Sequence, residues 1–127
     1  MSAQSNKLAA ELVYRCLELR EAATKQHLMA VQGSYAMHKA LEEYASSIGD
    51  LADTFAESYQ GVYGLFKSFP EVECEDGPFL DQLKAFRKWT MENRDDICCS
   101  DDSELQNAID EIVTLGNRVM YKLRFFK

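Results

Sequence analysis

Apolar residues recur at intervals of three and four along four stretches of the chain. This is the spacing of amphipathic α-helices that each bury one stripe. From this pattern and the breaks between the stretches, we expect helices at about 6–32, 34–60, 78–97 and 101–126. No stretch carries the signal of a strand. The predicted fold class is therefore all-α, a four-helix bundle in which the stripes are buried against each other.

Short local signals define the predicted helix ends. Gly33 separates the first two helices, and Ser34 is a suitable N-cap for the second. Pro78 has the fixed φ of a first helical residue. Asp101 and Glu104 have the spacing of a capping box at the start of the fourth helix.

The predicted connection between the second and third helices is long, whereas the other two turns are short. Residues 61–77 include Pro70 and the acidic run 71–76, so we expect them to be solvated and irregular. Such a segment spans up to ~55 Å, which exceeds the ~40 Å of the second helix. A crossover along the bundle, as in ferritin-like topology, is therefore allowed, and so is a simple up-down-up-down bundle.

Composition favours one soluble domain covering residues 1–127. Hydrophobic residues make up 46% of the chain, which is enough for a core. The 21 acidic residues exceed the 14 basic ones, and the net charge of −7 disfavours nucleic acid as a partner. Because we find neither a run of ~20 apolar residues nor a signal peptide, we expect a cytoplasmic protein without a membrane partner.

Cysteines and aromatic residues receive ordinary structural interpretations. The four cysteines form neither a C-x-x-C motif nor a zinc ribbon, so we expect reduced thiols. Phe86 and Trp89 are expected in the core or in a subunit interface, and so is the pair Phe125 and Phe126. Phe126 also extends the apolar stripe of the last helix.

Both histidines lie close to the first turn. His27 stands six residues before Gly33 and His38 five after it, so on antiparallel helices both lie roughly 8–9 Å from the turn. Glu42 follows His38 by one helical turn. Imidazole with carboxylate is a ligand set suited to iron, zinc or manganese. The alternative interpretation is a hydrogen-bonded core histidine beside a solvated acidic face.

A second acidic pair, Asp53 and Glu57, lies on the same predicted helix. Asp53 is fifteen residues from His38 and therefore ~22 Å along the axis. Metal–ligand bonds are about 2 Å long, so one ion cannot bind both groups of one chain. A site that uses both requires a second copy, docked antiparallel across a two-fold axis, with two symmetric sites.

The segments that carry these residues resemble the signature of the Dps branch of the ferritin-like superfamily. That family reads His-Trp-Asn-Val-x-Gly, then Leu-His-x-x-Phe-(Asp/Glu), then Asp-x-x-Ala-Glu-Arg, and the corresponding segments here are 27–33, 36–43 and 53–57. The resemblance implies ferroxidase sites shared between two-fold-related subunits. The implied metal ligands are His27, His38 and Glu42 from one chain and Asp53 and Glu57 from its mate.

The chain also departs from that signature. Leu28 replaces the Trp, Ser58 replaces the final Arg, and the two histidines are one residue closer together than usual. The spacing makes His27 the ligand that departs most from the family. The Lys-rich tail with which some members bind DNA has no counterpart, so DNA binding is not carried over.

The resulting functional hypothesis is an iron-binding protein that oxidises ferrous iron with peroxide or oxygen and stores the product. The site would hold one or two iron ions or another divalent metal, with no catalytic residue apart from the ligands. The resemblance implies a homodimer or a larger homo-oligomer, up to a dodecamer. The alternative is a metal-free ferritin-like structural or interaction module, and a third is an enzyme that uses a different divalent metal.

Overall fold

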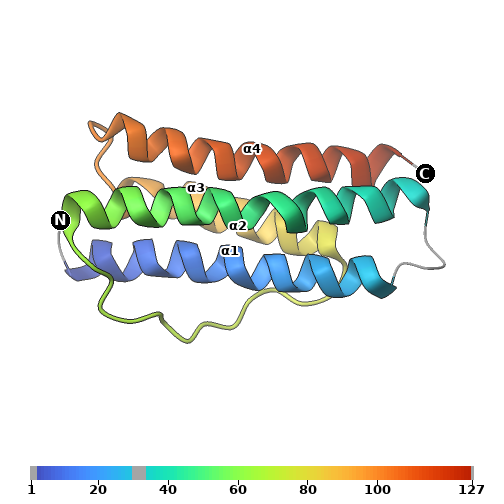
Figure 1. Ribbon diagram of the computed structural model, residues 1–127, viewed down its shortest axis with the longest axis horizontal. Coiled ribbons are helices and arrows are strands. Elements are labelled where there is room, and N and C mark those ends of the chain that lie inside the picture. Colours follow the sequence, from blue (N-terminus) through green and yellow to red (C-terminus); the bar gives the residue numbers. More distant parts are fainter. Residues whose placement is uncertain (1–2, 30–33, 127) are drawn as a thin grey trace.

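The computed structural model describes residues 3–29 and 34–126 and contains four α-helices in this part of the chain. They are α1 (Ala3–Met29), α2 (Tyr35–Tyr63), α3 (Phe79–Ile97) and α4 (Ser103–Phe125). The helices lie side by side in one bundle (Figure 1), and the described residues include no strand. The predicted all-α four-helix bundle is confirmed.

Each helix packs against two neighbours. α1 contacts α2 and α3, and α4 contacts the same two helices. Residues 64–78 run back along the bundle beside α1, so α2 and α3 point in the same direction (Figure 1). All packed neighbours are therefore antiparallel. This is the one-crossover connectivity of ferritin-like folds, and the up-down-up-down alternative is wrong.

The core consists of the apolar stripes that the sequence pattern marks. Residues at intervals of three, four and seven are fully buried on α2 and α4, as helical amphipathicity requires. Fully buried positions include Leu12 and Ala23 of α1, Leu41, Ile48 and Phe55 of α2, and Leu105, Ile109 and Ile112 of α4. Leu83 adds α3 to the same core.

The start of α2 follows the sequence prediction. Ser34 is its N-cap, and the Met37 backbone N–H donates to the Ser34 hydroxyl oxygen at 3.0 Å. The His38 N–H donates to the Ser34 carbonyl oxygen at 3.1 Å, which places His38 in the first turn. Gly33, the predicted stop of the first helix, lies outside the described residues.

Two helices begin one or two residues later than predicted, with different residues at their N-caps. Pro78 occupies the N-cap position of α3, and the helix begins at Phe79. α4 begins at Ser103, and its N-cap Asp102 makes no capping bond. The Asp102 carboxylate instead accepts a hydrogen bond from the Tyr63 hydroxyl, which raises the pKa of Tyr63 to about 12. The predicted capping box of Asp101 and Glu104 is therefore absent, and the N-cap carboxylate of Asp102 contacts α2 instead.

The beginning of the crossover is fixed to α1. α2 continues to Tyr63, three residues beyond its predicted end, and stops at Gly64, whose φ of 94° favours glycine. The Asn6 side chain donates to the Leu65 carbonyl oxygen and accepts from the Lys67 N–H, each at 3.2 Å. Asn6 therefore holds the first residues of the crossover against the first turns of α1.

Phe126 is not part of the buried stripe, contrary to the sequence prediction. Its side chain is 45% exposed, because α4 ends at Phe125 and Phe126 adopts extended backbone. Phe125 is exposed as well, whereas Phe86 is buried and Trp89 packs against the core.

All four cysteines are free, and Cys16 and Cys98 are buried. Burial raises the pKa of the Cys98 thiol to about 11.

No helix in the described part of the chain is both long and apolar enough to cross a bilayer.

Replacing the N-cap of α2 tests how this helix is fixed. We expect Ser34→Ala to lower the free energy of unfolding by about 1 kcal/mol, because the Met37 N–H loses its partner. Urea denaturation followed by circular dichroism measures the change. Ser46→Ala is the control, since the exposed Ser46 hydroxyl bonds only to Glu43 within its own helix; it should change stability by less than about 0.5 kcal/mol. Equal losses in the two variants would contradict a capping role.

Candidate metal site

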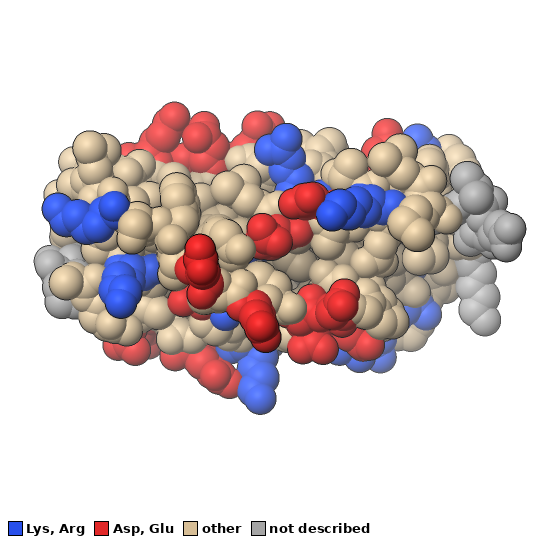
Figure 2. Space-filling model, turned by 90° about the horizontal axis from the view of Figure 1, so that it is seen from below, with Lys and Arg blue, Asp and Glu red and all other residues tan. Residues whose placement is uncertain are grey.

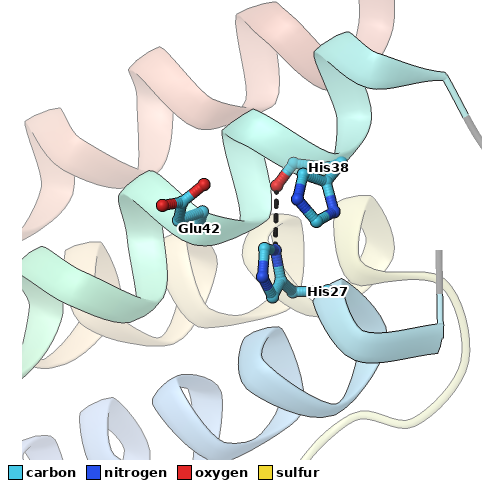
Figure 3. A group of neighbouring side chains, drawn as sticks. All are labelled: His27, His38 and Glu42. Carbon is cyan, nitrogen blue, oxygen red and sulfur yellow. Dashed lines mark hydrogen bonds between the residues drawn. The ribbon is translucent and has the colours of Figure 1, made fainter. Parts of the chain in front are cut away.

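Three potential metal ligands meet at one end of the bundle. His27 lies in the last turn of α1, and His38 and Glu42 lie in the first two turns of α2 (Figure 3). The two histidines are half-buried and Glu42 is exposed. One nitrogen of each imidazole and one carboxylate oxygen all lie within 4.8 Å of one another. The structure thus brings together the three residues of one chain that the sequence predicted as metal ligands.

A backbone hydrogen bond orients His27. Its Nδ1 lies 3.1 Å from the His38 carbonyl oxygen, drawn as a dashed line in Figure 3. A carbonyl oxygen can only accept, so this bond requires a hydrogen on Nδ1 and leaves the lone pair of Nε2 free. Metal-binding histidines in proteins are commonly held in this way by a bond from the other ring nitrogen.

The two imidazole rings are stacked, with centroids 4.0 Å apart and planes at 27°. Ligand atoms of one tetrahedral ion are ~3.4 Å apart at bond lengths of ~2.1 Å. Binding of one ion would therefore require the ligand atoms to move about 1–1.5 Å closer together and one of the stacked rings to turn, so that both nitrogen lone pairs point to the ion. Because Glu42 is exposed, its carboxylate has room for such a movement.

Lys39 forms an exposed ion pair with Glu42. Its ammonium lies 3.3 Å from Glu42 Oε2 and 5.7 Å from the centre of the Tyr35 ring. The hydrogen bond and charge of Glu42 raise the pKa of Lys39. We did not single out Lys39 from the sequence, although its spacing of three residues from Glu42 is a usual signal for a helical ion pair.

Asp53 and Glu57 do not join this group within one chain. Both are exposed on α2, and Asp53 is fifteen residues from His38, which places it ~22 Å along the helix. The metal-capable group found among the described residues consists of His27, His38 and Glu42 only.

A surface groove lies along α1 and α2 and includes Asp53, but none of the three potential ligands lines it. It has a volume of about 820 Å³ and is lined by α1, by α2 and by Phe66 and Phe69 of the crossover. Ser46, one turn after Glu42, lines the groove, and so does Asp53. The sequence does not reveal this groove, because its walls come from segments that are distant in the chain.

The residues of α2 in the middle of the groove are small. Ala45, Ser46 and Gly49 line it there. The Arg20 side chain packs closely over Gly49, where an added Cβ would lie 3.2 Å from the guanidinium. Arg20 therefore fills the space beside Gly49, and Ala45 and Ser46 are the small side chains that remain at the centre of this face.

The chain belongs to the Family of unknown function (DUF5856), whose model matches residues 27–123. The matched segment contains all five predicted ligands, from His27 to Glu57. No curated protein and no solved structure matches the chain.

The tautomer of His27 is a direct test of this geometry. In the metal-free protein, we expect neutral His27 to carry its hydrogen on Nδ1, because the His38 carbonyl accepts it. Two-bond ¹⁵N–¹H correlation spectra of ¹⁵N-labelled protein at pH 8 distinguish the two tautomers, and His27→Gln assigns the signals. A predominant Nε2–H form would show that this hydrogen bond is absent in solution.

Proposed function

We propose that this member of a family of unknown function binds ferrous iron at His27, His38 and Glu42 and oxidises it. Asp53 and Glu57 of a second copy would complete each site. The convergence of two imidazoles and a carboxylate, with His27 oriented by the His38 carbonyl, is the observation that carries this proposal. Two histidines and one carboxylate with open positions form a set typical of non-haem ferrous iron.

The need for a second copy follows from distance. The three ligands of one chain leave coordination positions open, and Asp53 of the same chain is ~22 Å away along α2. In an antiparallel pair with two-fold symmetry, Asp53 of each copy can face the histidines of the other. The midpoint between His38 and Asp53 falls at Ala45 and Ser46, where small side chains permit close contact.

The negative charge of the side chains at the proposed interface between two copies favours a bound cation there. Glu42, Asp53 and Glu57 are all acidic, and a bound cation would offset the cost of burying them between two copies. Asp and Glu side chains also gather over the middle of the face formed by α1 and the crossover (Figure 2). With a net charge of −7, the protein attracts cations from solution.

The residues have distinct roles in the proposed reaction. The neutral imidazoles of His27 and His38 would donate nitrogen lone pairs to the iron. Coordination positions that no protein ligand occupies would remain open for an oxidant. The carboxylates would favour ferric over ferrous iron through their negative charge. Two ferrous ions each give one electron to a peroxide, which takes up two protons and leaves as two waters. The proposal assigns no proton transfer to any other side chain.

Mixing two inactive variants tests the shared site. We expect His38→Ala and Asp53→Ala each to lose stoichiometric ferrous binding and peroxide-dependent oxidation, because each disrupts both sites of a dimer. Random mixing of the two should restore about a quarter of the wild-type capacity, since half of the dimers would be mixed and each would contain one intact site. Anaerobic ferrous titration followed by absorbance after peroxide addition measures both properties.

Asp50→Ala is the matched control for Asp53→Ala, because Asp50 is also exposed on α2 and lines the same groove. It should retain wild-type binding. Full activity of the His38→Ala variant would refute the metal site. Loss in both single variants without recovery in the mixture would refute the sharing. A wild-type protein that binds no iron would leave the metal-free interaction module as the better hypothesis.

Lys39 should compete with the metal for Glu42. We expect Lys39→Met to tighten ferrous binding by no more than about fivefold, because an ion pair between exposed side chains contributes little in water. Lys25→Met removes a comparable exposed pair, with Glu21 of α1, and should leave the dissociation constant unchanged. Weaker binding in Lys39→Met would mean that the lysine helps to orient Glu42 rather than competing for it.

A further inference from the structure

The end of α4 exposes a cluster of aromatic rings. Tyr121, Phe125 and Phe126 are 54%, 61% and 45% exposed. The centre of the Tyr121 ring lies 5.8 Å from that of Phe125 and 5.3 Å from that of Phe126, so Tyr121 contacts both rings outside the core. The Arg124 guanidinium lies 4.9 Å from the Phe125 ring centre and has no carboxylate partner among the described residues. These four residues are called the aromatic end below.

The charge of the chain changes sign at this end. No acidic residue follows Glu111, whereas four of the 14 basic residues do. The rest of the chain carries ten basic residues against all 21 acidic ones. Arg118 and Lys122 both pair with Glu43, so Arg124 is the described cation of this segment that remains available to another molecule.

The opposite end of the bundle is acidic. Asp95, Asp96, Asp101 and Glu104 surround the turn between α3 and α4, and all four are exposed. They form no ion pair within the described part of the chain. Figure 1 shows this turn and the carboxyl end of α4 at opposite ends of the molecule. These four residues are called the acidic end.

We infer that the aromatic end of one copy binds the acidic end of the next, so that copies associate head to tail. Two complementary properties carry this inference. The unpaired Arg124 meets unpaired carboxylates, and the exposed rings meet Val62 and Leu65, which are exposed apolar side chains at the end of the molecule that carries the acidic turn. Charge complementarity determines partner choice and orientation more than raw affinity, and exposed aromatic rings supply buried area.

This contact differs in symmetry from the proposed metal-sharing pair. A two-fold pair uses the same surface on both copies, whereas a head-to-tail contact joins two different surfaces and leaves one of each free. Copies can therefore be added until a ring closes. The inference goes beyond the proposed function and does not require metal binding, so its test is carried out with EDTA.

Two variants block the two surfaces separately. Arg124→Glu should disable the aromatic end, and Asp95→Lys combined with Asp101→Lys should disable the acidic end. In sedimentation velocity, we expect the mass of the wild type to rise with concentration, and each variant to self-associate at least about tenfold more weakly. Lys88→Glu makes the same charge change in the middle of α3, where the side chain is exposed, and should behave as the wild type.

The decisive measurement is a mixture of the two blocked variants. Each retains one intact surface, so an equimolar mixture should form one-to-one pairs that neither forms alone, and circular dichroism confirms that both are folded. A mixture no larger than its components would overturn the inference, and so would a wild type whose mass is independent of concentration. Association only on vesicles containing an anionic phospholipid would also overturn it, because a lipid surface would then occupy the aromatic end.

Discussion

The crossover of residues 64–78 is the constraint on which the arrangement of this molecule depends. Because it returns the chain along the whole bundle, α2 and α3 run in the same direction and all packed neighbours are antiparallel. The first hairpin then brings His27 and His38 together at one end, and the second places the turn with Asp101 at the other. Asn6 fixes the start of the crossover and so forms part of the same constraint.

Much of the fold is encoded in local patterns, whereas the errors arise where distant residues intervene. The buried stripes and the Ser34 cap were predicted because they depend on residues within one or two turns. The capping box at Asp101 is absent because α4 begins at Ser103 with Asp102 as its N-cap, and the Asp102 carboxylate bonds to Tyr63 of another helix. Phe126 was placed in the core because periodicity does not show where the last helix ends. Chain direction could not be chosen, since the crossover length permits both topologies.

The geometry of the candidate site was also predictable only in part. Counting residues from Gly33 placed His27 and His38 at one height, and the structure brings both close to Glu42. The same counting placed Asp53 ~22 Å from His38 along the helix axis. Both residues lie on α2, so this distance is fixed within one chain. The hydrogen bond from His27 to the His38 carbonyl and the groove along α1 and α2 could not be predicted. They depend on side-chain rotamers and on the approach of the crossover, which leave no periodic signal in the sequence.

The antiparallel order of the helices also determines where the electric field of the molecule originates. Each end of the bundle contains two helix N-termini and two C-termini, so the backbone macrodipoles of neighbouring helices oppose one another. Any polarity along the long axis must therefore come from side chains such as Arg124 and Asp101. Fields from exposed side chains fade within a Debye length of ~8 Å at physiological ionic strength. Each end of the molecule therefore interacts with charged groups of other molecules only at short distances, and these distances decrease as the salt concentration rises.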